Sequence, residues 1–253
     1  TTAQNTRTAD TPFERSVKGS WSEHEHGAVL HRSPTRLASF AWRAYGLTQG
    51  LCLPPDAGHM AEWVQNLGGV VRFLGDDGVI PGGQTQHRAP ITHTVHTYDG
   101  GFVTWGLVHE GVNLTLAEGW HGPRSHGSQP SEGKASAYHQ LVFIALPDGH
   151  TVLGLQHCRT ADYRTYIVEV KGLHLNLPND LYNHFERRLV TDQGTMRLES
   201  PPAYDHVINL KSRWANVDER LGVIGLYGAE HLVVARSKSR RGGRYASLYV
   251  DEL

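Results

Sequence analysis

The chain has 253 residues, of which 39% are hydrophobic and 19% charged, and it contains 28 glycines and 12 prolines. This composition suits a turn-rich globular protein better than a helical bundle or a disordered chain. The 24 Lys and Arg residues nearly balance the 25 Asp and Glu residues, so a formal net charge of -1 gives no general attraction to nucleic acid or to an anionic membrane. No apolar run approaches the roughly 20 residues that span a bilayer. We therefore expect neither nucleic acid nor a membrane as a partner.

Residues 1–14 form a polar N-terminal segment without a hydrophobic signal core, and residues 15–253 are predicted to form a single β-sandwich domain. Because the chain opens with Thr1 rather than Met, we expect a processed product or a piece of a longer polypeptide. The compartment is left open between secreted and cytoplasmic. Cys52 and Cys158 are expected to be buried free thiols, since two cysteines make neither a disulfide framework nor a four-cysteine zinc site.

The first predicted strands lie on either side of a histidine-bearing turn at residues 22–27, and a longer strand follows over 37–45. Side chains alternate between the two faces of a strand. In the longer strand this alternation places Phe40 and Trp42 on the side that a core would cover, and Arg43 on the opposite side.

Asp56 could cap a short helix over residues 57–66. Strands at 91–98 and 102–109 are predicted to form a hairpin, whose centre is either an Asp-Gly or a Gly-Gly dipeptide. Residues 119–134 show no apolar periodicity and are expected to form a long loop, of the kind that is usually functional or disordered.

Two nearly uninterrupted apolar segments, 141–146 and 151–155, are predicted to pair as core strands. The dipeptide Asp148-Gly149 between them is typical of a two-residue primed turn, which needs positive φ at both positions. This pairing would place His139 opposite Cys158, and a structural cross-strand pair is favoured over half of a zinc site.

Short strands joined by Gly, Pro and Asp turns continue to the C-terminus. They are predicted at 173–177, 188–190, 195–199, 206–211, 221–227, 231–236 and 244–250. The predicted fold class is therefore all-β, a large antiparallel β-sandwich with at most one or two short helices.

The 17 histidines raise the question of a metal site. His24 and His26 have the spacing that would place two imidazoles on one face of an extended strand, as in cupin-like metal enzymes. The sequence that follows lacks the Glu that such a site would want a few residues later. A solvated pair in a loop is the favoured alternative to a divalent metal at these two residues.

Motifs for nucleophilic or nucleotide chemistry are absent from the sequence: it contains no Gly-x-Ser-x-Gly elbow and no glycine-rich phosphate loop. Paired carboxylates for glycoside hydrolysis stay open, because Glu62, Asp99, Glu110 and Glu118 all lie near predicted strand ends. A basic turn over 236–244 is compatible with an anionic polymer, although a solvated hairpin tip is the more usual explanation.

A cluster of aromatic and amide side chains is the strongest indication of a ligand. Trp42, Arg43, Tyr45, Gln49, Trp63, Gln65 and Asn66 lie within about one structural unit of each other. Aromatic faces stack against the apolar face of a sugar ring, while Arg, Gln and Asn form directional hydrogen bonds with hydroxyls and carboxylates. We predict substrate contacts from Arg43, Gln49, Trp63, Gln65 and Asn66, with a core position as the alternative for the tryptophans.

Two segments, Gly172-Leu-His-Leu-Asn-Leu-Pro-Asn-Asp-Leu-Tyr-Asn and Trp214-Ala-Asn-Val-Asp-Glu-Arg-Leu-Gly-Val, together with the strand-only tail, give the latter two-thirds of the chain a resemblance to a known architecture. The chain resembles the large β-sandwich, or supersandwich, of heparinase- and chondroitinase-type polysaccharide lyases. In that family a helical toroid supplies most catalytic residues and the sandwich lines one wall of the cleft. The resemblance implies a sandwich that contacts an acidic, uronic-acid-containing polysaccharide beside a helical toroid from the same precursor.

Elimination at a uronic acid needs a neutralised carboxylate, a base near C5 and an acid for the leaving oxygen. His93, Tyr98 and His109 are the predicted catalytic residues, and no cofactor is required by this chemistry. Two alternatives stay open: a non-catalytic carbohydrate-binding or structural module, and a cupin-like enzyme that uses a metal at His24 and His26.

Overall fold

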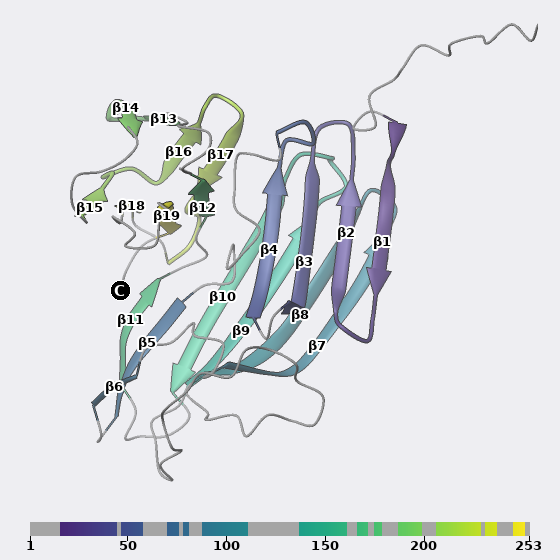
Figure 1. The fold of residues 1–253 in the computed structure, drawn as a ribbon, viewed down its shortest axis with the longest axis horizontal. Helices are drawn as coiled ribbons and strands as arrows, with labels where there is room; N and C mark the ends of the chain where they lie inside the picture. Colours follow the sequence, from purple (N-terminus) through teal and green to yellow (C-terminus); the bar gives the residue numbers. More distant parts are fainter. Residues whose placement is uncertain are drawn as a thin grey trace, which may run out of the picture.

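The computed structural model describes residues 16–44, 47–57, 70–75, 78–80, 88–110, 137–160, 166–171, 175–178, 187–198, 206–228, 231–236 and 245–250. Its regular elements in these ranges are nineteen β-strands, arranged in antiparallel sheets (Figure 1). The expected all-β, sandwich-like fold is therefore confirmed. Within the same ranges, no helix has the length and apolar character needed to cross a bilayer.

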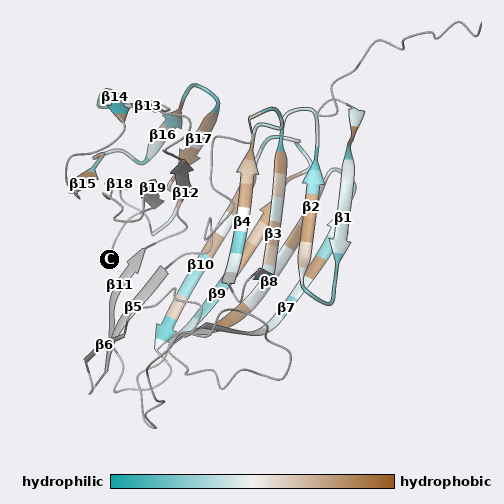
Figure 2. Ribbon diagram, viewed as in Figure 1, coloured by the Kyte–Doolittle hydropathy of each residue, from teal (hydrophilic) through white to brown (hydrophobic). Residues whose placement is uncertain are grey.

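Two four-stranded sheets face each other and form the sandwich (Figure 1). The first sheet follows the chain order β1-β2-β3-β4, with β1 (Gly19–Glu23), β2 (Ala28–Arg32), β3 (Leu37–Ala44) and β4 (Leu47–Leu53). The second has the order β10-β9-β8-β7, with β7 (Arg88–Tyr98), β8 (Gly101–Glu110), β9 (Ala137–Ala145) and β10 (Val152–Thr160). Hydrophobic residues recur along the strands of both layers (Figure 2).

Aromatic side chains fill the space between these two sheets. Phe40 packs against Phe143 at a ring-centroid distance of 5.2 Å, and Phe143 stacks on Phe102 at 6.0 Å. Trp42 is fully buried, and its indole Nε1 donates a hydrogen bond of 2.6 Å to Thr104 Oγ1. The alternation predicted for the third strand is confirmed, because Phe40 and Trp42 face this core whereas Arg43 is exposed.

The remaining strands form three smaller sheets. One has the order β11-β5-β6, with β5 (Val70–Gly75), β6 (Gly78–Ile80) and β11 (Tyr166–Lys171). Another has the order β12-β19-β18-β15, with β12 (Leu175–Pro178), β15 (His206–Asn209), β18 (Leu232–Arg236) and β19 (Tyr245–Val250). The last has the order β14-β13-β16-β17, with β13 (Arg187–Thr191), β14 (Gly194–Leu198), β16 (Trp214–Val217) and β17 (Leu221–Ile224).

A second hydrophobic core joins the C-terminal sheets to the end of β4. Leu51 and Leu53 are almost fully buried in one cluster with Leu189, Val217 and Val234. Arg220 also pairs with Asp56, which follows β4. The C-terminal strands therefore pack against β4 of the first sheet.

The two hairpins of the second sheet pair nearly as predicted. In the β7–β8 hairpin Tyr98 is opposite Gly101, which identifies Asp99-Gly100 as the centre. In the β9–β10 hairpin His139 is opposite Cys158, as expected. Both cysteines are free, and burial raises the pKa of the Cys52 thiol to about 11, so this thiol stays protonated at neutral pH.

The turn between β9 and β10 differs from the predicted two-residue primed type. Leu146 N donates to Thr151 O, which closes a four-residue loop, and of Asp148 and Gly149 only Gly149 has positive φ. The Asp148 carboxylate accepts hydrogen bonds from the amides of His150 and Thr151 and so stabilises the wider loop. Together with the Thr151 hydroxyl, these bonds lower the pKa of Asp148 to about 2.

A buried arginine ties this loop to both sheets. The Arg36 guanidinium, 1% exposed, donates to the carbonyl oxygens of Leu146 and Thr151 at 2.8 and 2.5 Å and to Gly100 O at 3.3 Å. It also lies 3.0 Å from His31 Nδ1, and burial lowers the pKa of His31, so a neutral ring accepts this bond. One side chain from the β2–β3 turn therefore closes one end of the sandwich.

Replacing Arg36 with Ala is expected to lower the free energy of unfolding by about 3 kcal/mol or more, because several buried carbonyl groups lose their donor. Urea denaturation followed by circular dichroism measures the change. Arg188, an exposed arginine paired with Glu219, is the matched control, and Arg188→Ala should cost at most about 1 kcal/mol. Equal losses in the two variants would contradict the structural role of Arg36.

The predicted helix beyond Ala57, the long loop at 119–134 and the basic turn after Arg236 lie outside the described residues.

Candidate functional site

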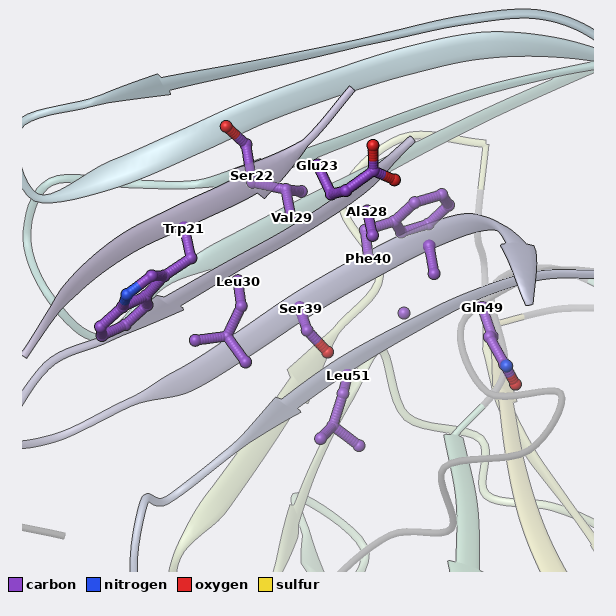
Figure 3. A pocket seen from close by; sticks show the side chains of 12 residues that line it. Trp21, Ser22, Glu23, Ala28, Val29, Leu30, Ser39, Phe40, Gln49 and Leu51 are labelled. Atoms are coloured by element: carbon purple, nitrogen blue, oxygen red, sulfur yellow. The ribbon is translucent and has the colours of Figure 1, made fainter. Parts of the chain in front are cut away.

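An open groove of about 390 Å³ lies on the outer face of the first sheet (Figure 3). All four strands contribute to it, and the side chains that project into it alternate with those that fill the core. Val29 and Phe40, for example, are buried between the sheets, whereas their neighbours Leu30 and Ser39 point to the groove side. The groove is therefore a direct product of strand alternation.

The first row of groove residues crosses the sheet in register. Trp21 on β1 is opposite Leu30 on β2, which is opposite Ser39 on β3, which is opposite Leu51 on β4. Trp21 is 46% exposed and lies on the edge strand, while Leu51 is buried against the C-terminal sheets. The Trp21 indole therefore lies at one side of the groove and the buried Leu51 side chain at the other (Figure 3).

The second row contains small residues at its centre. Glu23 is opposite Ala28, which is opposite Ala41, which is opposite Gln49. Two alanines on the middle strands leave space above the sheet that larger side chains would fill. Gln49, Ser39 and Glu23 add an amide, a hydroxyl and a carboxylate to a lining that is mostly apolar.

The turn between β1 and β2 is held by the Glu23 carboxylate. It accepts hydrogen bonds from the amides of Glu25 and His26 at 2.9 and 2.8 Å, and it pairs with His26 Nδ1 at 2.7 Å. The amide of His26 is the main cause that lowers the pKa of Glu23. Glu23 is therefore an anion at neutral pH that is already engaged in turn formation.

The geometric basis of the predicted metal pair is wrong. His24 and His26 lie in the exposed turn at residues 24–27 and not on a strand, because the chain reverses direction there. Among the described residues, the group whose ligand atoms lie within 4.8 Å of one another is Glu23, Glu25 and His26, without His24. His24 Nε2 instead lies 3.4 Å from Ser22 Oγ. A divalent metal here stays an untested prediction.

His93 lies at the junction of the two sheets, close to this turn. Its ring stacks on Trp42 at a centroid distance of 6.1 Å, and it packs so closely on Gly27 that a Cβ there would lie 2.3 Å from His93 Cδ2. Gly27 also has a φ of 64°, so glycine is required for two reasons. Burial, followed by the charge of Arg43, lowers the pKa of His93, which keeps the imidazole neutral at neutral pH.

The predicted catalytic and binding residues are only partly brought together. Arg43 and His93 lie within electrostatic reach of each other. Tyr98 donates its hydroxyl proton to Ala145 O at 2.6 Å, and it is five residues from His93 along one strand, about 17 Å away. His109 belongs to β8, but the structure does not describe its side chain.

Gln49 lines the groove, whereas Trp63, Gln65 and Asn66 lie outside the described residues. The sequence reasoning did not single out Trp21 or Ser39. The pairing of the first two strands across the turn at 22–27 could have identified Trp21, because it places this residue opposite Leu30 on the outer face.

The electrostatic effect of Arg43 on His93 can be measured directly. In Arg43→Gln, the pKa of His93 is expected to rise toward its ordinary value of about 6.5 yet stay below it, because burial is the larger cause. An NMR titration of the histidine ring protons gives this pKa. Arg159→Gln, which removes an arginine from the second sheet, should leave it unchanged. No rise in Arg43→Gln would show that the two groups do not interact.

Comparison with known proteins does not assign the chain to a family. No protein-family model matches the chain, and no curated protein and no solved structure matches it. The resemblance to polysaccharide lyases is neither supported nor contradicted by these comparisons, so it stays a prediction.

Proposed function

We propose that the groove on the outer face of β1–β4 binds a carbohydrate chain, and that the sandwich is the substrate-contacting part of a carbohydrate-active enzyme. The observation that carries the proposal is the half-exposed indole of Trp21 beside a floor of Ala28, Ser39 and Ala41, with the amide of Gln49 across the sheet. The volume of about 390 Å³ lies within the range of about 300–1,000 Å³ that is usual for ligand sites.

A sugar chain fits this combination better than a wholly apolar ligand. A pyranose ring has an apolar face that stacks on an indole, and hydroxyl groups around its edge that need hydrogen-bonding partners. Trp21 supplies the first contact, while Ser39 and Gln49 supply partners on the same surface. The small side chains between them leave room for the ring itself.

An acidic polysaccharide is the favoured substrate class. Arg43 is exposed, in contrast to its buried neighbour Trp42. It lies on β3, two residues after Ala41, which lines the groove. A guanidinium there can form a bidentate pair with the carboxylate of a uronic acid. Glu23, the acidic residue of the groove, accepts hydrogen bonds from two amides and lies 2.7 Å from His26 Nδ1, so it opposes an anionic chain less than a free carboxylate would.

Polysaccharide binding is expected to fall at least tenfold in Trp21→Ala, because the stacking surface is removed. Isothermal titration calorimetry with hyaluronan, chondroitin sulfate, heparin, alginate and polygalacturonate oligosaccharides measures the effect. Trp214→Ala removes a comparably exposed indole from β16 and serves as the matched control. Unchanged affinity in Trp21→Ala, or no binding of any of these polysaccharides by the wild type, would refute the proposal.

β-Elimination at a uronic acid is the second candidate function, and the proximity of Arg43 and His93 favours it. A neutral His93 imidazole could accept the C5 proton, while the Arg43 guanidinium, which acts on His93 electrostatically, could neutralise the uronate carboxylate. The acid for the leaving oxygen would come from a helical segment of the same precursor, which the lyase resemblance implies. A non-catalytic binding module is the alternative.

Elimination is expected to produce the ultraviolet absorbance of an unsaturated uronate when the full precursor is mixed with an acidic polysaccharide. His93→Gln should abolish this signal yet leave the binding of the same polysaccharide within about twofold, because the base acts on the reaction and the groove supplies affinity. Absorbance that persists in His93→Gln would exclude His93 as the base. No absorbance from the wild-type precursor, with binding intact, would identify a binding module.

A further inference from the structure

The outer face of the second sheet is unusually apolar. Large hydrophobic side chains project from three adjacent strands and lie in register: Val103, Trp105 and Leu107 on β8, Val142 and Ile144 on β9, and Leu153 and Leu155 on β10. Trp105 is 51% exposed and Leu155 55% exposed. The register places Trp105, Val142 and Leu155 in one row across the middle of the sheet.

Polar groups surround this apolar centre. Thr94 on β7 is opposite Trp105, and His96 is opposite Val103. At the other side His157 Nδ1 lies 3.2 Å from Gln140 Oε1, and the Arg159 guanidinium lies 5.1 Å from the Tyr138 ring centroid. An apolar centre with a polar rim is the usual anatomy of a protein interface, whereas an isolated sheet exposed to water would keep polar residues on this side.

We propose that this face is the interface of a homodimer, in which two copies pack their β7–β10 sheets against each other around a two-fold axis. Side chains from two such sheets interdigitate in the same way as those between the layers of one sandwich. In an isologous interface every residue of the patch occurs on both sides. Trp105 and Leu155, the most exposed apolar side chains of this face, would be the anchors.

The size of the face agrees with what a stable dimer needs. Four strands about 4.8 Å apart and nine residues that rise about 3.4 Å each give a flat face of about 19 by 30 Å, or about 600 Å². Two such faces would together bury about 1,200 Å², which is the lower end of the range for specific interfaces. Aliphatic side chains dominate this centre, which favours a protein surface over a sugar chain.

The dimer leaves the proposed binding groove open. The groove lies on the outer face of β1–β4, and this face and the apolar face of β7–β10 are the two opposite outer surfaces of the sandwich (Figure 1). Two grooves would therefore face away from each other in one particle. The interface stands independently of what the groove binds.

Sedimentation equilibrium of the wild-type chain is expected to show a monomer–dimer equilibrium. Trp105→Glu and Leu155→Glu should each raise the dissociation constant at least about tenfold, because each substitution buries two carboxylates, one from each copy. Thr94→Arg offers a second test that keeps the apolar residues, since it adds a charge beside Trp105 at the rim. Circular dichroism shows whether each variant is folded.

Ile224→Glu is the matched control, because Ile224 is 65% exposed on β17, outside the proposed interface. It should leave the dissociation constant unchanged. A monomeric wild type, or a dimer that resists all three substitutions on the face, would overturn the proposal. A monomer whose polysaccharide binding falls in Trp105→Glu would also overturn it, and would identify the face as a sugar-binding surface.

Discussion

The buried guanidinium of Arg36 is the constraint on which the arrangement of the two sheets depends. It extends from the β2–β3 turn and donates hydrogen bonds to the β9–β10 loop and to the β7–β8 turn. A cation in this position is costly unless its donors are satisfied, and the carboxylate oxygen of Asp148 is 3.6 Å away. Backbone carbonyls therefore carry most of the compensation, so the two turns must keep their conformations for the charge to stay buried.

The groove depends on the register of the strands in the first sheet. Its two rows exist because neighbouring strands from β1 to β4 pair in register at both rows, so that Trp21, Leu30 and Ser39 share one face. A slip of one residue between β2 and β3 would turn Phe40 outward and place Ser39 in the aromatic core. The strong packing of Phe40 and Trp42 on the inner side thus fixes which side chains meet a ligand on the outer side.

More of the fold than of the candidate site could be predicted from the sequence. Alternation along residues 37–43 and the pairing of His139 with Cys158 follow from local patterns and were correctly predicted. The β9–β10 turn was predicted incorrectly because the Asp148 side chain, by accepting two amides, stabilises a wider loop than the dipeptide preference suggests. Trp21 belongs to the groove only through its pairing with a second strand, and no local pattern marks it as different from a core tryptophan.

The positions of His93 and Arg43 indicate how binding and chemistry would be divided in this molecule. His93 projects from β7 toward the core side and stacks on Trp42, whereas Arg43 is exposed on β3, so the two approach each other only near the β1–β2 turn. Tyr98, another predicted catalytic residue, donates its hydroxyl proton to Ala145 O and lies about 17 Å from His93 along β7. Among the described residues, His93 and Arg43 are the candidates for the base and the cation of the proposed elimination, and Tyr98 does not lie beside them, so binding is the function that the geometry supports best.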